Sequence, residues 1–199
     1  MLILASASPR RREILTTLGI AHRVEVADID ESTQPGESPT AYVARVAVAK
    51  ALAVGGRALA HEFVLAADTT VVLGDTILGK PESDAEAKRM LQGLMGRSHD
   101  VLTAVAVLAG KGAAEGAHVQ VVRTRVTFVS ASESAIDLYV ACGEGRDKAG
   151  SYAVQGRGMG FVSSLTGSYS NVVGLPAAET IALLLAAGAL SSWPLEVVS

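Results

Sequence analysis

Residues 63–81 constrain the fold more than any other stretch, because a single acid separates two apolar runs there. The sequence reads FVLAADTTVVLGDTILGKP. The pattern predicts a strand ending at an acidic corner at Asp68, a second strand over Thr70–Leu73, a tight turn, and a short return strand that exits at Lys80. Because an isolated charge is too costly to bury, we expect Asp68 to be solvated by a cleft, paired, or bound to a metal.

An acid and a lysine that a hairpin brings to one cleft suit polyphosphate chemistry. In that interpretation Asp68 holds a cation and Lys80 holds phosphate oxygens. These residues alone also allow a plainer alternative, a turn aspartate and a solvated lysine.

Length and composition narrow the class of protein. The 199 residues allow one large domain or two small lobes around a cleft, and 49% hydrophobic residues suffice for a substantial core. A net charge of -3 gives no general basic footprint for nucleic acid. The longest apolar run, Thr180–Leu190, is too short to span a bilayer, and no leader pattern follows Met1. We expect a soluble cytoplasmic protein with Cys142, the single cysteine, as an inert core thiol.

The N-terminal segment predicts an anion site. Leu2–Ala5 is typical of a buried strand, Ser6–Ser8 of a tight loop, and Pro9 of the first turn of a helix. Such a strand–loop–helix arrangement points free backbone N–H groups and the positive end of the helix dipole at one spot. The three arginines Arg10–Arg12 oppose that dipole unless an anion or nearby acids compensate. A solvated basic helix start is the alternative.

Acidic residues cluster after the next predicted strand, His22–Ala27. Residues 28–31 read DIDE, and carboxylates at a strand end can form a site for a hard cation. A solvated acidic loop is the alternative. A second helix is expected to begin at Ser38-Pro39 and to end near Val54, with Lys50 on or near its flank.

The rest of the chain predicts a mixed sheet. Capping boxes indicate helix starts at Ser83 and Ser130, and the strands expected are His99–Leu108, His118–Val129 and Met159–Leu165. Early alternation of strands and helices followed by a long hairpin favours a mixed α/β sheet with two lobes over a purely parallel one.

Five segments occur in order along the chain: LASASPRRREIL (4–15), AADTTVVLGDTILGKP (66–81), GRSHDVLTAVAV (96–107), DKAGSYAVQG (147–156) and GSYSNVVGLP (167–176). Together they resemble the Maf family of nucleoside triphosphate pyrophosphatases. The resemblance implies an α/β fold with an elongated mixed β-sheet flanked by helices and two lobes around a central cleft, as in inosine triphosphatases, with residues 1–199 forming one domain without a separable linker. It also implies a cytoplasmic, divalent-metal-dependent enzyme, often a homodimer, that cleaves nucleoside triphosphates between the α- and β-phosphates.

The resemblance also implies roles for individual residues. Asp68 matches the proton acceptor, and Glu31 with Asp68 matches the acids that hold Mg²⁺, Mn²⁺ or Co²⁺. Such a metal acidifies the attacking water and, with fixed cations, stabilises the developing charge. The positions matched to phosphate binding are Ser8, Arg11, Lys50 and Lys80, and those matched to substrate choice are Arg10, Thr69 and Gln155.

Gln155 together with Arg10 resembles the branch of the family that acts on dTTP and UTP. A side-chain amide offers a donor and an acceptor, and uracil or thymine presents O4 as acceptor beside N3–H as donor. We therefore expect hydrolysis of dTTP, UTP and modified pyrimidine nucleotides in a house-cleaning or division-linked role. The sister branch, with glutamate in place of Gln155, prefers 7-methyl-GTP and is the first alternative.

Non-enzymatic alternatives belong to other classes. A nucleotide-binding inhibitor of septum formation would bind without hydrolysis, and the full set of acids and lysines argues against it. A nucleic-acid-binding protein is disfavoured because the chain has no basic stripe and only 4% aromatic residues for stacking.

Overall fold

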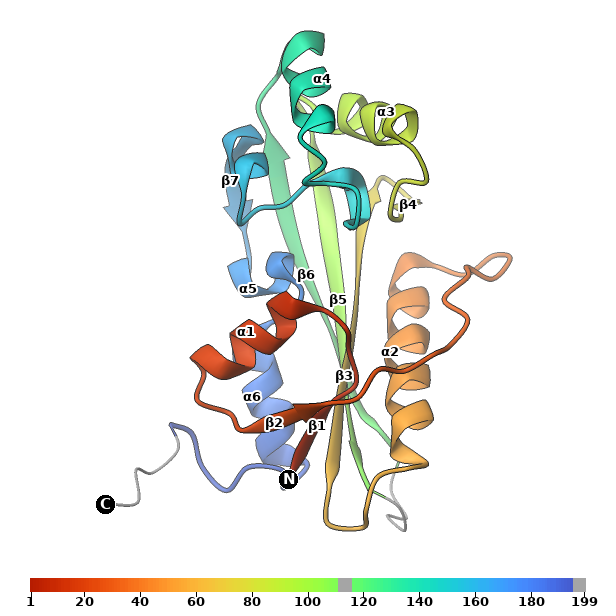
Figure 1. Cartoon of the computed structure of the whole chain (residues 1–199), viewed down its shortest axis with the longest axis vertical. Coiled ribbons are helices and arrows are strands. Elements are labelled where there is room, and N and C mark those ends of the chain that lie inside the picture. Colours follow the sequence, from red (N-terminus) through yellow and green to blue (C-terminus); the bar gives the residue numbers. More distant parts are fainter. Residues whose placement is uncertain (111–115, 195–199) are drawn as a thin grey trace. The chain divides into compact units, whose positions relative to one another are not determined.

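A computed structural model describes residues 1–110 and 116–194, and its strands form one mixed sheet (Figure 1). The strand order is β2-β1-β3-β5-β6-β7, with β4 paired to β3. The pairs β1–β2 and β1–β3 are parallel, whereas β3–β4 and β6–β7 are antiparallel. The strands are β1 Leu2–Leu4, β2 His22–Val24, β3 Phe63–Leu73, β4 Thr76–Leu78, β5 Ser98–Ala109, β6 His118–Phe128 and β7 Val162–Thr166. The predicted mixed α/β sheet is confirmed.

The chain divides into two compact units. Unit 1 takes the described residues of 1–68, 103–122 and 174–199, and unit 2 takes 69–102 and 123–173. Three of the four divisions fall inside β3, β5 and β6, so these strands contribute to both units, and the fourth follows Val173.

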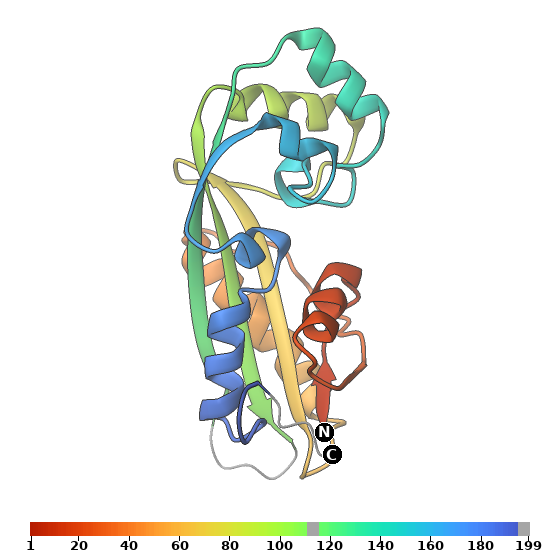
Figure 2. The ribbon, with the colours of Figure 1, turned by 90° about the vertical axis from the view of Figure 1, so that its left-hand side faces the viewer.

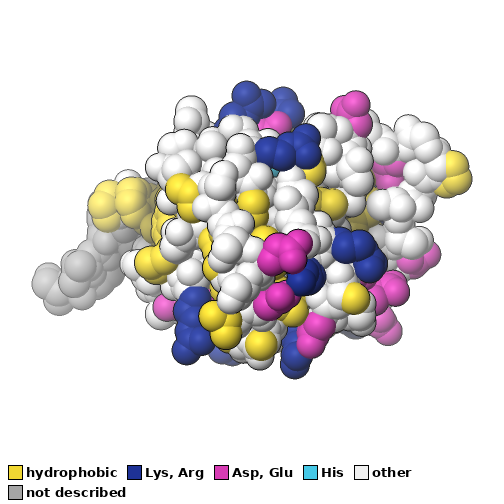
Figure 3. Space-filling view, turned by 90° about the horizontal axis from the view of Figure 1, so that it is seen from above, with side chains coloured by type: hydrophobic (Ala, Val, Ile, Leu, Met, Phe, Trp, Pro, Cys, Tyr) yellow, Lys and Arg dark blue, Asp and Glu magenta, His cyan; other side chains and the backbone are white. Residues whose placement is uncertain are grey.

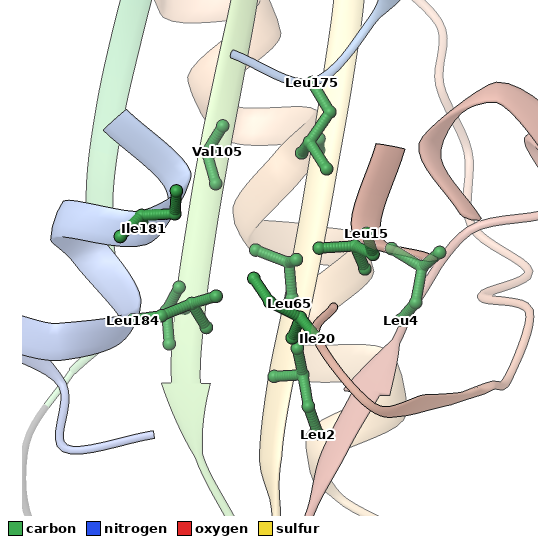
Figure 4. Close-up of a cluster of buried hydrophobic side chains, with 11 residues drawn as sticks. Leu2, Leu4, Leu15, Ile20, Leu65, Val105, Leu175, Ile181 and Leu184 are labelled. Atoms are coloured by element: carbon green, nitrogen blue, oxygen red, sulfur yellow. The ribbon is translucent and has the colours of Figure 1, made fainter. Parts of the chain in front are cut away.

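Unit 1 contains strand segments with helices on both faces. The helix α2 (Pro39–Gly55) lies on one face, and α1 (Pro9–Thr17) and α6 (Ala177–Ala186) lie on the other (Figures 1 and 2). Side chains alternate along β3, so that Leu65 joins the apolar cluster beneath α1 and α6. Figure 4 shows this cluster, whose labelled members are Leu2, Leu4, Leu15, Ile20, Leu65, Val105, Leu175, Ile181 and Leu184.

Unit 2 contains three further helices and an aromatic cluster. The helices α3 (Asp84–Leu94) and α4 (Glu133–Ala141) pack together, and the short α5 spans Tyr169–Val173. The ring of Phe128 lies 4.8 Å, between centroids, from both His99 and Tyr152, with the planes nearly perpendicular.

Several local predictions are confirmed and one helix start is wrong. The Oγ atoms of Ser38 and Ser83 accept hydrogen bonds from Ala41 N–H (3.3 Å) and Glu86 N–H (3.2 Å), so both residues cap helices as expected. The capping box at Ser130 is wrong, because α4 begins two residues later and Ser132 is its N-cap.

The acidic corner at Asp68 is also wrong, since β3 runs unbroken through it. The predicted strand His22–Ala27 ends at Val24, and the strand expected over Met159–Leu165 begins only at Val162, after a 3₁₀ turn over Arg157–Phe161. Cys142 is exposed rather than buried, because α4 ends at Ala141 and leaves the thiol at the cap position.

The turn predicted to join the two long strands lies partly outside the described residues. No described helix combines the length and the hydropathy that crossing a membrane requires.

Candidate active site

Three side chains from separate segments of unit 1 meet at one ammonium group. Lys50 Nζ lies 2.8 Å from Asp68 Oδ1 and 3.0 Å from Glu31 Oε1. Lys50 comes from α2, Asp68 from the middle of β3, and Glu31 from the loop between β2 and α2. We call these three residues the carboxylate–lysine centre.

Burial divides the centre into an inner pair and an outer acid. The side chains of Asp68 and Lys50 are 8% and 11% exposed, whereas that of Glu31 is 48% exposed. Alternation along β3 turns Asp68 away from the cluster containing Leu65 and toward α2. The paired lysine makes a buried carboxylate tolerable there, so the strand does not need to break.

The loop that carries Glu31 is fastened to α2. The hydroxyl of Tyr42 donates to the backbone carbonyl of Glu31 at 3.0 Å, and Arg45 Nη2 donates to the carbonyl of Ser32 at 2.8 Å. Arg45 Nε also pairs with Glu37 Oε1 at 2.6 Å. Tyr42 and Arg45, in neighbouring turns of α2, therefore hold this loop at Glu31, Ser32 and Glu37.

Tyr42 is a site residue that sequence reasoning missed. Burial, followed by the charges of Asp68 and Glu31, raises the pKa of Tyr42 to about 12, so the hydroxyl stays protonated and able to donate. Its signal was present in the sequence, because positions 42 and 50 are eight apart and face the same side of a helix.

The N-terminal loop is organised by a buried arginine. Arg11 Nε donates to the carbonyl of Gly174 at 2.8 Å and Nη1 donates to Ser6 Oγ at 3.1 Å, while Ser8 N–H donates to the same Oγ at 3.2 Å. Burial lowers the pKa of Arg11, and the charge of Asp68 opposes that effect. Arg10 and Ser8 are half-buried beside it.

The remaining predicted site residues belong to unit 2. Thr69 follows Asp68 directly in β3, is half-buried and faces the opposite side of the strand. Lys80 is exposed just beyond β4, and Gln155 is exposed in the loop between two 3₁₀ turns. Gln155 makes no hydrogen bond to any residue that the structure describes.

A glycine fixes the backbone next to Lys80. Gly150 N–H donates to the carbonyl of Gly79 at 3.1 Å, and Gly150 has φ +67°. A Cβ at position 150 would lie 2.9 Å from a methyl of Val71, so a larger residue has no room there. Gly150 thus holds the backbone where the chain leaves the β3–β4 hairpin.

The acidic side chains of the carboxylate–lysine centre suit a cation that is also bound by water or substrate oxygens. Among residues 1–110 and 116–194, no group of three or more His, Cys, Asp and Glu side chains could hold a metal ion. Glu31 and Asp68 supply two carboxylates, both hard oxygen donors. Mg²⁺ commonly binds through one or two carboxylates together with substrate phosphates and water, so the residues present fit that mode.

Comparison with known proteins identifies the family. The family model described as Maf-like protein matches residues 1–187. The dTTP/UTP pyrophosphatase of Anaeromyxobacter dehalogenans (strain 2CP-1 / ATCC BAA-258) is 52% identical over 192 residues, 96% of each chain. That of Myxococcus xanthus (strain DK1622) is 52% identical over 195 residues, 97% of this chain and 95% of the other. The solved Ham1 protein of Staphylococcus aureus is 15% identical with a TM-score of 0.46, over 64% of this chain and 71% of that one. Because the family model and both relatives extend over nearly the whole sequence, this chain belongs to the Maf family.

Proposed function

We propose that this protein is a nucleoside triphosphate pyrophosphatase that hydrolyses dTTP and UTP to the nucleoside monophosphate and pyrophosphate. Relatives named dTTP/UTP pyrophosphatase share about half of its residues over nearly the full length. The structural observation that carries the proposal is the buried Lys50–Asp68 pair with Glu31 on its solvent side.

The carboxylate–lysine centre supplies a base and a cation at the same point. In the proposed reaction a water oxygen attacks the α-phosphorus, and a proton of that water passes to the Asp68 carboxylate. The bond between the α-phosphorus and the bridging oxygen breaks, and its electron pair leaves with pyrophosphate. The Lys50 ammonium orients Asp68 through the 2.8 Å bond and stabilises negative charge on the phosphoryl oxygens.

Glu31 and Asp68 are the residues that would hold a divalent cation, with Mg²⁺, Mn²⁺ and Co²⁺ as the candidates. Such an ion supplies charge neutralisation at the phosphates and a more acidic water. Because Glu31 is the half-exposed member of the centre, its carboxylate is the one accessible from solvent.

We assign the other residues by their surroundings. Lys80 is exposed and suited to contact phosphate oxygens directly. Arg11 already bonds Gly174 and Ser6, so its proposed contribution is to shape the Ser8 loop and to add positive charge. Selection of the substrate falls to Arg10, Thr69 and Gln155.

The decisive experiment is a substrate panel. Initial rates of pyrophosphate release are measured for UTP, dTTP, CTP, GTP and 7-methyl-GTP with Mg²⁺, Mn²⁺ and Co²⁺ in turn, and with a chelator. We expect UTP and dTTP to give the highest kcat/KM, and the chelator to abolish turnover. Preference for 7-methyl-GTP, or binding without hydrolysis, would refute the proposal.

A substitution tests the role of Gln155. Glutamate is an acceptor only, so Gln155→Glu should lower kcat/KM for UTP by tenfold or more. The ratio of kcat/KM for 7-methyl-GTP to that for UTP should rise. Gln120→Glu is the control, because Gln120 is an exposed glutamine of β6, away from the loop that carries Gln155 in the sequence. An unchanged preference in Gln155→Glu would remove this residue from substrate choice.

The homodimer, the cytoplasmic location, the house-cleaning or division-linked role and the absence of a nucleic-acid partner stay predictions. The interspersed acidic and basic side chains of the face drawn in Figure 3 support the last of these. Size-exclusion chromatography with light scattering tests the dimer.

A further inference from the structure

The loop that carries Gln155 is held from one side by a carboxylate. Glu144 Oε1 accepts a hydrogen bond from Arg157 N–H at 2.9 Å, and Glu144 Oε2 accepts one from Gly158 N–H at 3.0 Å. Both donors lie just C-terminal to Gln155, so this carboxylate fixes the backbone that leaves that residue.

The other side of the loop is held by a tyrosine bonded to the same carboxylate. The Tyr139 hydroxyl donates to Glu144 Oε2 at 2.8 Å and accepts from Ala153 N–H at 3.1 Å. Ala153 lies two residues before Gln155 and Arg157 two residues after it. The Glu144–Tyr139 pair therefore holds the backbone on both sides of Gln155, and neither side chain contacts Gln155 through a hydrogen bond.

Two glycines let the loop approach this pair closely. A Cβ at position 156 would lie 2.0 Å from Glu144 Oε1, and a Cβ at position 158 would lie 2.9 Å from the Tyr139 hydroxyl oxygen. The backbone of residues 156–158 thus packs directly against the polar atoms with which it forms hydrogen bonds.

Burial makes the arrangement stiff around an exposed side chain. Tyr139 is 6% exposed, and its ring packs edge-on against Phe161 with centroids 5.2 Å apart. Ala153 and Gly158 are buried on either side of Gln155, whose own side chain projects into solvent. Burial alone would raise the pKa of Glu144, but the hydrogen bonds from Arg157, Tyr139 and Gly158 lower it, so the acceptor stays charged.

We propose that Glu144 and Tyr139 are positioning residues for nucleobase selection, acting by fixing the backbone from which Gln155 presents its amide. This rests on the proposed function, because it names what supports the residue that reads the base. A site that selects by hydrogen bonding needs its donor and acceptor at set positions, and a displaced amide loses the bonds that only the correct base makes.

The test uses Tyr139→Phe and Glu144→Gln in the full chain. Tyr139→Phe keeps the buried ring and removes only the hydroxyl, so it preserves the packing on Phe161. Steady-state rates with UTP and CTP, which differ at one edge of the base, should give at least a fivefold fall in the UTP-to-CTP ratio of kcat/KM. The fall should come mainly from a higher KM for UTP, with kcat within about twofold, because base contacts act equally on ground and transition states.

A double-mutant cycle separates positioning from general weakening of the fold. If the pair acts through Gln155, then Tyr139→Phe should leave the ratio unchanged in a Gln155→Ala background. Asp84→Asn is the matched control, because Asp84 makes bonds of 3.0 and 2.9 Å to Arg146 in the same unit and none to residues 153–158. It should leave the wild-type ratio intact.

The two failures are distinguishable. Wild-type protein that releases no pyrophosphate from UTP or dTTP refutes the proposed function. If wild-type protein prefers UTP, two results overturn the positioning role. One is an unchanged UTP-to-CTP ratio of kcat/KM in Tyr139→Phe and Glu144→Gln. The other is an equal fall in that ratio with and without Gln155. Hydrogen exchange at residues 153–158 gives an independent readout, and unchanged protection in both variants would also overturn it.

Discussion

The ammonium group of Lys50 lies 2.8 Å from Oδ1 of Asp68, with both side chains close to fully shielded from water. Each group in such a pair is tolerable because the other is present, and removing one leaves an uncompensated buried charge. Glu31, on the solvent side of the same ammonium, is held less tightly. The catalytic proposal and the local stability of unit 1 consequently depend on the same contact.

Asp68→Asn should slow turnover severely while preserving the fold. An amide oxygen still accepts the hydrogen bond from Lys50 but cannot take a proton from water. We expect kcat for UTP to fall by about 10²–10⁴-fold, measured as pyrophosphate release with Mg²⁺, with a normal circular-dichroism spectrum. Asp75→Asn, in the exposed turn after β3, is the control. Normal release by Asp68→Asn would end the assignment of Asp68 as base.

Lys50→Met should destabilise the protein in a way that a divalent cation partly reverses. Without the ammonium, two carboxylates face one another, and we expect unfolding free energy to fall by about 3–5 kcal/mol in metal-free buffer. Added Mg²⁺ should raise the stability of the variant more than that of wild type. Lys88→Met removes a pair with Asp137 that is much more accessible to solvent than the Lys50–Asp68 pair, so it should cost far less. Equal responses to Mg²⁺ would contradict a cation site at Glu31 and Asp68.

Tyr42→Phe should weaken metal activation without greatly changing the chemical step. The variant loses the bond from the hydroxyl to the Glu31 carbonyl, so the acidic loop must be ordered when the cation binds. We expect the Mg²⁺ concentration for half-maximal rate to rise severalfold, with kcat at saturating Mg²⁺ within about twofold. Tyr169→Phe, on an exposed tyrosine, serves for comparison. An unaltered Mg²⁺ requirement would show that the loop needs no such anchor.

His99 should make the protein sensitive to mild acid. Burial lowers the pKa of His99 to about 4, with the charge of Asp100 opposing the shift, whereas an unfolded histidine titrates near 6.5. Below that pH the unfolded chain binds a proton that the folded protein excludes, so stability is complete above about pH 6.5 and is lost toward pH 4. The loss from this residue is about 3 kcal/mol by pH 4.

Urea unfolding at pH 7, 6, 5 and 4 measures this loss. His99→Gln keeps a hydrogen-bonding group at the position of His99 Nε2, which meets the Tyr152 hydroxyl at 2.9 Å, but it cannot titrate. We expect the stability of wild type to fall more steeply with acid than that of the variant. Parallel profiles would refute the prediction.

The sequence predicted those features that depend on residues close together in the chain. The helix starts at Ser38 and Ser83 followed from capping residues, and the end of α2 followed from its glycine pair. The charge of Asp68 was expected to be solvated by a cleft, paired or bound to a metal, and it is paired with Lys50, but the predicted end of the strand at Asp68 was wrong. Its partner lies 18 residues earlier in the chain, and a pattern that reads neighbours alone interprets an unpaired charge as a break.

Contacts that a local pattern does not show explain the late start of β7 and the surroundings of Arg11. The N–H groups of Arg157 and Gly158 donate to Glu144, and that of Met159 donates to the Gly156 carbonyl at 3.0 Å, so this backbone forms a turn before β7 can begin. Arg11 bonds a carbonyl 163 residues away. The roles proposed for Thr69, Lys80 and Gln155 came from resemblance to a family, because their local pattern does not distinguish them from surface residues.

The interleaving of the two units limits how the gene could be divided. The chain passes from one unit to the other after Asp68, Leu102, Val122 and Val173, so no single cut excises either unit as a continuous fragment. A truncation ending at Asp68 would retain the proposed base and lose the rest of its own strand. Each unit is formed by separate stretches of the sequence. Functional halves of this enzyme would therefore have to be obtained by complementation of co-expressed pieces.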